Sequence, residues 1–446
     1  MTKSVHSLTE GSIAQGMLRF AMPLFLGNLF QQLYYTVDAL IVGNFLGSSA
    51  LAAVSSSSSL IYMLVGFFQG IGSGAGVLVA HAYGSKNQEA LHNSVHTTVA
   101  AGIAAGILMT VLGVFAAPHL LHWVGTPDSV LPEASTYLRI YFGGAMGLVL
   151  YNAFVGIIQA VGDSRHPLYY LIVSSVVNLV LDVVFIAVFH WGVAGAAFAT
   201  VLSQMISAVL CLILLVRTPE TWRVHLRRIR FHGPTFLKIL HIGLPAGVQS
   251  SIVAFANVLV QSHVNSFGEM AMAAYGASAT VQGFVFLPIM SFNTALTTFV
   301  GQNLGAKNVD RTRKGARFGI LTNVALAQLI GVLVFLSAPV FIRAFNDNPE
   351  VIRLGVREVH FESLAFGILA LSHSIASILR GAGRTMFPML VMMVCWCVIR
   401  VGFLAIAIPL THSIDMVYTV FPLTWTLSAL TFLVYYRHCH WLPEER

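Results

Sequence analysis

Long apolar stretches recur from one end of the chain to the other, separated by short polar or charged connections. Each is long enough to cross a bilayer as a helix, which takes about 20 residues. They are continuously apolar, whereas the strands of a membrane barrel alternate over about ten residues. We therefore predict an all-α polytopic membrane protein with twelve transmembrane helices. Their approximate ranges are 17–46, 51–81, 91–117, 134–161, 166–189, 192–216, 239–267, 272–302, 315–343, 354–380, 385–410 and 414–437.

Short motifs repeat at a nearly constant offset, which divides the spans into two sets of six. The matching pairs, 221 or 222 residues apart, are Gly84–Asn87 with Gly305–Asn308, Gly162–Pro167 with Gly383–Pro388, and Met22-Pro23 with Leu244-Pro245. Because six is even, both copies start on the same side of the membrane, as in parallel-repeat secondary transporters. We predict a six-helix lobe over 1–220, a basic cytoplasmic linker over 221–238 and a six-helix lobe over 239–446.

The composition supports this class, and the basic residues indicate the topology. The chain has 446 residues, of which 57% are hydrophobic and 9% charged, whereas a soluble chain is about 25% charged. The connections that we assign to one side hold 19 of the 24 Lys and Arg residues. The positive-inside rule therefore places both termini in the cytoplasm of a bacterial-type inner membrane. The formal net charge of +7 reflects this distribution and does not indicate a nucleic-acid partner.

Two acids lie deep in apolar spans of the first half. Asp38 and Asp182 sit at similar depth, and Asn178 lies one helical turn before Asp182 on the same face. Asn152 and Thr200 fall at comparable depth in neighbouring spans. Buried carboxylates in a membrane are costly and usually mark an ion pathway, so these residues are the predicted ion-coupling group. A structural polar network that locks the helices together is the alternative.

The second half contains more scattered polar residues, and no comparable cluster is expected there. Glu362 and Arg400 fall at similar depth, which favours a structural ion pair. The candidate residues for a substrate cavity are Gln31, Tyr34, Tyr35, Gln282 and Arg400.

Several activities find no support in the sequence. The phosphate-binding pattern Gly-x-x-x-x-Gly-Lys-Ser/Thr is absent, and no connection is long enough for an ATPase domain. Cys395 and Cys397 have no accompanying Cys/His cluster, so they read as packing residues and not as a metal site. We expect no enzymatic activity and no cofactor, with small organic molecules and membrane lipids as partners and a monomeric state.

Taken together, these features resemble the multidrug and toxic compound extrusion (MATE) family of the MOP superfamily. The resemblance rests on the two six-helix halves, Met22-Pro23, Val37-Asp38 followed by Ile41–Gly43, and the paired Gly-x-Lys-Asn loops. The segments 159–163, 178–182 and 195–200 resemble the DinF-like branch, which places its ion site in the first half. The seventh span, at Gln249–Val253, lacks the acid that the other branch carries.

The resemblance implies export of organic, often cationic and amphipathic, compounds by exchange with H+ or Na+, with alternating access between two lobes. It implies roles for Asp38, Asn152, Asn178, Asp182 and Thr200 around the ion, and Na+ would be held at Asp38, Asn178, Asp182 and Thr200. Two alternatives remain open. One is a lipid-linked oligosaccharide or lipid flippase of the same superfamily, for which several cavity arginines would be expected. The other is an integral membrane enzyme or scaffold.

Overall fold

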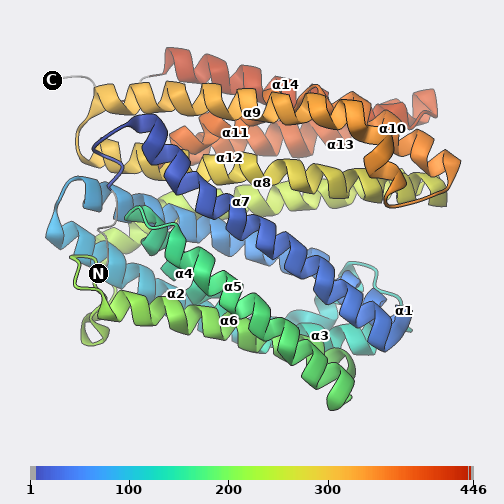
Figure 1. The fold of residues 1–446 in the computed structure, drawn as a ribbon, viewed down its shortest axis with the longest axis horizontal. Coiled ribbons are helices and arrows are strands. Elements are labelled where there is room, and N and C mark those ends of the chain that lie inside the picture. Colours follow the sequence, from blue (N-terminus) through green and yellow to red (C-terminus); the bar gives the residue numbers. More distant parts are fainter. Residues whose placement is uncertain (1–6, 440, 443–446) are drawn as a thin grey trace. The chain divides into compact units, whose positions relative to one another are not determined.

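The computed structural model describes residues 7–439, 441 and 442, with the backbone alone at positions 39, 40, 43, 44, 48, 49, 51, 52, 56 and 59. This part of the chain is almost entirely helical (Figure 1). Its first-half helices are α1 Ile13–Gly84, α2 Gln88–Trp123, α3 Leu131–Gly143, α4 Ala145–Ala160, α5 Arg165–Asp182, η1 Val183–Val188 and α6 Gly192–Arg217. Those that follow are η2 Leu226–Arg228, α7 Gly233–Asn265, α8 Glu269–Gly305, α9 Val309–Arg343, α10 Pro349–Ser363, α11 Phe366–Gly381, α12 Met386–Met392, η3 Met393–Ile399, α13 Arg400–Thr411 and α14 Asp415–His438.

The helices account for the predicted spans. Among the described residues, ten segments are long and apolar enough to cross a membrane, and two bent helix pairs bring the total to twelve if each pair forms one span. Helix α1 contains two of these spans, Ile13–Asp38 and Ala53–Gly84, because Gly47 interrupts it with a φ of 84°. The bent pairs are α3 with α4, at 48°, and α10 with α11, at 51°. The all-α, multi-span fold class is therefore confirmed, although α7 begins at Gly233 and so takes in the end of the expected linker.

The sequence repeat is also a repeat of backbone geometry. Lys86 and Lys307 both have a φ of 56°, an uncommon value for residues with a side chain. Each is followed by an asparagine that caps the next helix: Asn87 accepts from the amide of Ala90, and Asn308 from the amide of Arg311. The positive-φ pairs Gly47 and Gly268, Gly162 and Gly383, and His190 and His412 also lie 221 or 222 residues apart. The two halves therefore turn at matching points.

The fifth span of each half contains a π-helical segment. In the first half, η1 begins directly after Asp182, and in the second half η3 ends directly before Arg400. Short π-helical segments inside α-helices occur frequently at functional sites. In each half, a buried charged residue therefore adjoins the irregular turn of the same span.

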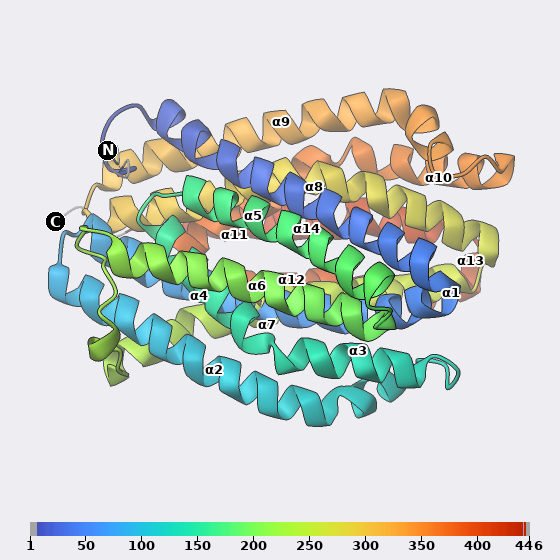
Figure 2. The ribbon, with the colours of Figure 1, turned by 60° about the horizontal axis from the view of Figure 1, so that its bottom comes forward.

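Contacts divide the chain into two compact units, Met22–Gly247 and Leu8–Ala21 with Val248–Arg446, apart from the residues before Leu8. In the first unit, α4 packs on α2 and α6, and α6 also lies beside α5 (Figure 2). In the second unit, α8, α9, α11 and α14 run side by side, with α11 in contact with the other three (Figure 1). The expected basic linker, residues 221–238, lies within the first unit, where Trp222 and Val224 are buried in its core.

Within the first unit, α1 and the start of α7 approach closely at glycines on both helices. A Cβ atom added at Gly70 would lie 2.4 Å from the Cα of Gly247, and one at Gly74 would lie 2.3 Å from the Cα of Gly243. Both helices carry these glycines four residues apart, the spacing that lets membrane helices pack backbone to backbone.

The second unit holds the segment that precedes α1. The amide of Leu8 donates to Gln302 Oε1 over 2.9 Å, and Leu8 is 3% exposed. The guanidinium of Arg311 donates to the carbonyl oxygens of Leu8 and Glu10 over 2.9–3.2 Å. Arg311 therefore holds the segment before α1 against the start of α9.

Replacing Arg311 by glutamine should release this segment. Hydrogen bonds from a charged group are worth about 1.5–3 kcal/mol each, and about 1.4 kcal/mol corresponds to a tenfold change in an equilibrium constant. We therefore expect a glutamyl endopeptidase to cleave after Glu10 at least about tenfold faster in Arg311→Gln than in the wild type. The exposed neighbour Arg313 provides the control, and equal cleavage of Arg311→Gln and Arg313→Gln would show that Arg311 does not hold the segment.

Candidate functional site

The carboxylates of Asp38 and Asp182 meet inside the first unit. Asp38 lies on α1 and is half-buried, whereas Asp182, the last residue of α5, is fully buried. Each carboxyl group interacts directly with the other. Nevertheless, one oxygen of Asp38 and both oxygens of Asp182 lack a hydrogen-bond partner of good geometry. Two carboxylates so close together cannot both stay ionised at low cost, so this arrangement can take up one proton or one cation.

Polar groups from two further helices surround this pair. Asn178 lies one turn before Asp182 and is 1% exposed, with both amide atoms free of protein partners. Thr200 of α6 is buried and donates to the carbonyl of Ala196 over 3.0 Å. The hydroxyl of Tyr137 on α3 interacts with Thr200 and lies within electrostatic reach of both acids. Asn178, Thr200 and Tyr137 therefore supply neutral oxygen atoms around the two carboxylates.

An aromatic group extends from the acids along α1. Tyr34 lies near both Asp38 and Asp182, one turn along the helix. Its ring is 5.3 Å from that of Tyr35, which in turn lies 6.0 Å from Tyr62. The amide of Gln31 donates to the hydroxyl of Tyr35 over 3.2 Å. Three of the candidate cavity residues therefore form one group next to the acid pair.

Asn152 does not join this group through its side chain. Its amide nitrogen donates to the carbonyl of Leu148 one turn earlier in α4, over 2.9 Å. Its backbone carbonyl lies against Gly72 of α1, where an added Cβ atom would be 2.9 Å away. The contacts of Asn152 are therefore those of helix packing.

In the second unit, Gln282 and Arg400 lie near Glu362, but the expected Glu362–Arg400 ion pair does not form. Glu362 accepts a short hydrogen bond from the amide of Gln282. The guanidinium of Arg400 donates instead to Asn257 Oδ1 over 3.3 Å and to Thr424 Oγ1 over 2.9 Å. Depth along a helix had suggested the pairing, but depth does not fix the direction in which each side chain leaves its helix.

The expectation that the second half lacks an acidic cluster is also wrong. Glu358, one turn before Glu362, is fully buried with it. Sequence reasoning missed Glu358 because it lies only four residues inside the expected start of its span, in a segment rich in charged residues. Its spacing of four residues from Glu362 was the available signal.

Transition-metal chemistry finds no support in the described part of the chain. No group of three or more His, Cys, Asp or Glu side chains is arranged to hold a metal ion there. All four cysteines are free thiols.

The described residues form ten to twelve candidate membrane-spanning helices, arranged as two repeated halves with buried carboxylates. This arrangement is typical of polytopic membrane transporters. The MatE family model matches residues 23–184 and again 245–406, so the chain belongs to the MATE family of transporters. The two matched segments, 222 residues apart, coincide with the sequence repeat.

Relatives and solved structures agree with this assignment. The chain is 29% identical to the "Probable multidrug resistance protein YoeA" of Bacillus subtilis, over 96% of this chain and 94% of that protein. It is 24% identical to a "FAD transporter" of Shewanella oneidensis, over 83% and 80% of the two chains. The outward-facing structure of a multidrug resistance MATE family transporter matches with a TM-score of 0.91 at 21% identity, over 98% of both chains, which establishes the shared fold.

Proposed function

We propose that this protein exports organic, often cationic and amphipathic, compounds in exchange for H+ or Na+, by alternating access. The observation that carries the proposal is the direct contact of Asp38 with Asp182 inside membrane-spanning helices. Relatives named as multidrug resistance proteins support the substrate class. A transporter of this kind needs no enzymatic step and no cofactor besides the coupling ion.

The acid pair couples ion and substrate through its charge. With both carboxylates ionised, the site carries a negative charge that attracts water and a cationic substrate. One proton shared between Asp38 and Asp182 removes the repulsion between them and satisfies oxygen atoms that lack partners. The neutral site can then lose its water, and α1 and α5 can pack more closely. Because Tyr34 lies next to both acids, it is placed to contact the substrate that this change expels.

In the sodium version of this scheme, the cation takes the place of the shared proton. Asp38 and Asp182 supply the charge, and Asn178 and Thr200 supply neutral oxygen ligands. We favour the proton, because a close pair of acids suits protonation at least as well as it suits a complete cation cage.

Reconstituted transport distinguishes the two ions. Proteoliposomes holding a fluorescent organic cation are given a pH gradient without sodium, or a sodium gradient at constant pH. Proton coupling predicts dye movement with the first gradient alone, and sodium coupling predicts it with the second alone. Absence of dye movement with either gradient would contradict cation-coupled export. Movement of a lipid-linked oligosaccharide in its place would favour the flippase alternative.

We also propose that the protein is a monomer of the bacterial-type inner membrane, that both termini are cytoplasmic and that it belongs to the DinF-like branch. The distribution of Lys and Arg supports the orientation, while the termini themselves lie outside the described residues. The first-half position of Asp38 and Asp182 supports the branch. The variant Asp128→Cys, in the loop between α2 and α3, tests the orientation. A membrane-impermeant thiol reagent should label this cysteine from outside intact cells.

A further inference from the structure

The last turn of α11 carries an arginine whose charge has no partner. Arg380 lies one residue before the end of this helix and is half-buried. Its Nε atom is buried, and no acceptor among the described residues forms a hydrogen bond or an ion pair with its guanidinium. No acid of the described chain lies within electrostatic reach of it. Buried charges in proteins are normally paired, so Arg380 lacks a counter-ion.

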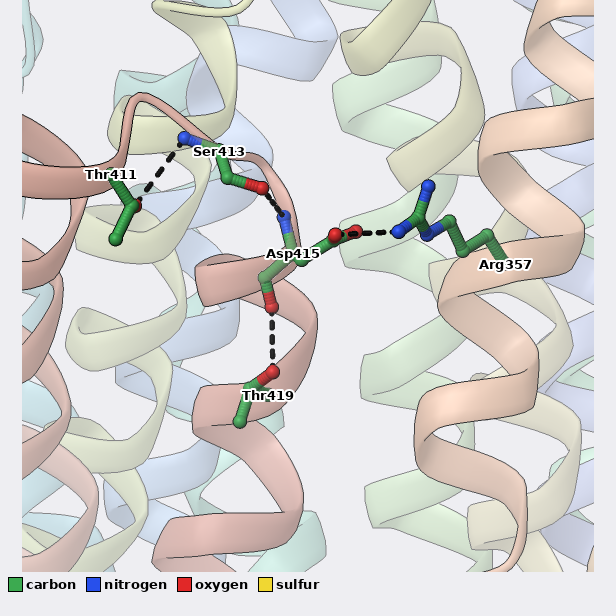
Figure 3. Close-up of polar contacts among 5 residues, drawn as sticks. All are labelled: Arg357, Thr411, Ser413, Asp415 and Thr419. Atoms are coloured by element: carbon green, nitrogen blue, oxygen red, sulfur yellow. Dashed lines mark hydrogen bonds and ion pairs between the residues drawn. The ribbon is translucent and has the colours of Figure 1, made fainter.

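Other arginines of the second unit have partners. Arg357 of α10 forms an ion pair of 2.6 Å with Asp415 at the start of α14, and the backbone of Asp415 is itself held by hydrogen bonds (Figure 3). The buried Arg400 donates to an amide oxygen and to a hydroxyl oxygen, and it lies over two aromatic rings. Arg380 differs from both, because its partner is missing from the described chain.

The sequence repeat shows that the fold does not require a charge at this point. The residue 221 positions before Arg380 is Gln159, which also lies one residue before the end of its helix, α4, and is also half-buried. The residue 221 positions before His373 is Asn152. The first half therefore closes the same helix with neutral amides, and the guanidinium and the imidazole belong to the second half alone.

His373 lies two turns before Arg380 on the same face of α11. The two side chains are within electrostatic reach of each other, and the Nε2 atom of His373 is buried without a partner. Its ring lies 5.4 Å from the Trp396 ring and 6.1 Å from the Phe286 ring, nearly perpendicular to both. Trp396 is in turn fixed by donating to Ser428 over 3.2 Å. The imidazole is therefore held in place while one of its nitrogens is unused.

These groups define the chemistry of a ligand. A guanidinium presents its N–H donors as a rigid fork that matches a carboxylate, a sulfonate or a phosphate. A charged side chain within a membrane span usually faces a cavity and marks the path of a substrate. Phe286 of α8 is half-buried beside the imidazole, and aromatic side chains commonly line sites for organic ligands. An organic oxyanion fits this combination better than a hydrated inorganic ion does.

We propose that Arg380 and His373 bind the oxyanion group of an organic compound, a carboxylate, sulfonate or phosphate, within the second unit. The aromatic part of the compound packs against Phe286. This site extends the compounds that the protein binds from organic cations to organic anions and zwitterions. It involves neither Asp38 nor Asp182.

The test measures the binding of two related dyes to the full-length protein in dodecyl maltoside, by fluorescence anisotropy. Fluorescein carries a free carboxylate, whereas tetramethylrhodamine methyl ester has the same ring system, a positive charge and an esterified carboxyl group. Arg380→Gln installs the residue type of the first half. We expect it to weaken fluorescein binding at least about tenfold, or about 1.4 kcal/mol, and to leave rhodamine binding unchanged. Arg384→Gln removes an exposed charge four residues further on and should affect neither dye.

Competition identifies the source of the oxyanion. Benzoate, a small aromatic carboxylate, should displace fluorescein from the wild type. Displacement by phosphatidylglycerol in mixed micelles, but neither by benzoate nor by phosphatidylcholine, would show that an anionic lipid headgroup occupies the site. That result would overturn the assignment to an organic compound.

Two further results would overturn the proposal. One is equal fluorescein affinity in the wild type and in Arg380→Gln. The other is a lower thermal unfolding midpoint in Arg380→Gln with unchanged fluorescein binding, which would show that Arg380 only stabilises the C-terminus of α11.

If Arg380→Gln does not fold, His373→Asn decides, because it also installs the residue type of the first half. We expect it to weaken fluorescein binding about two- to tenfold, the worth of one hydrogen bond, and no change would contradict the site. Because binding is measured without any gradient, failure of ion-coupled export leaves this outcome independent.

Discussion

Replacing Asp38 by asparagine is expected to reduce ion-driven efflux to the level of empty vesicles, a loss of at least about 100-fold, which corresponds to roughly 2.7 kcal/mol of lost coupling. The amide has nearly the same volume as the carboxyl group, but it cannot exchange a proton or supply charge to a cation. Efflux of a fluorescent cation from proteoliposomes under the productive gradient measures the effect.

The same substitution should leave the fold intact. Removing one of two neighbouring carboxylates relieves repulsion between buried like charges, so the thermal unfolding midpoint of Asp38→Asn should equal or exceed that of the wild type. The exposed Asp128, in the loop between α2 and α3, provides the matched control, and Asp128→Asn should transport normally. Wild-type efflux by Asp38→Asn would remove this residue from the mechanism.

The two acids should behave as one unit. Because Asp38 and Asp182 are in direct contact, Asp182→Asn should lose as much efflux as Asp38→Asn, and the double variant should lose no more than either. Residues in contact show such non-additive effects, whereas distant independent sites add. Residual efflux in both single variants that disappears only in the double variant would indicate two independent ion sites in this half.

Hydrophobic patterning predicted the helices well, because a bilayer forces each span to satisfy its own backbone hydrogen bonds. The repeat was equally visible, since turns with positive φ values restrict residue choice at Gly47 and Gly268 or Gly162 and Gly383. Span boundaries were less certain. Helix α7 begins at Gly233 and not at residue 239, because the polar residues before the apolar run continue the helix.

Side-chain direction was the feature that the sequence could not supply. Depth placed Asp38 and Asp182 at one level, and the structure brings them together. The same argument failed for Glu362, whose partner is Gln282 and not Arg400. Among the described residues, no ion pair joins Glu362 to Arg400, because the guanidinium of Arg400 points toward Asn257 and Thr424. Matching depth is therefore a condition for contact, but rotation about each helix axis decides whether contact occurs.

A large loss of stability from a single methyl group is expected at Gly74. An alanine there would bring its Cβ atom 2.3 Å from the Cα of Gly243, and the three nearest heavy atoms, which lie in Ile242 and Gly243, are all backbone. A flexible side chain could move aside, whereas two helix backbones must separate along their length. Overpacking of this kind costs about 1–3 kcal/mol, and we expect Gly74→Ala to lose about that much stability and to lower the thermal unfolding midpoint.

The matched control is another glycine, at which an alanine should stabilise the protein where Gly74→Ala destabilises it. Gly276 lies inside α8 with no atom within 4 Å of an added Cβ atom. Alanine is favoured over glycine in a helix by about 0.5–1 kcal/mol, so Gly276→Ala should match or exceed the wild type. Gly70→Ala should resemble Gly74→Ala, because its Cβ atom would lie 2.4 Å from the Cα of Gly247. Thermal unfolding in detergent compares the three variants. Equal midpoints for Gly74→Ala and Gly276→Ala would mean that α1 and α7 do not pack through their glycines.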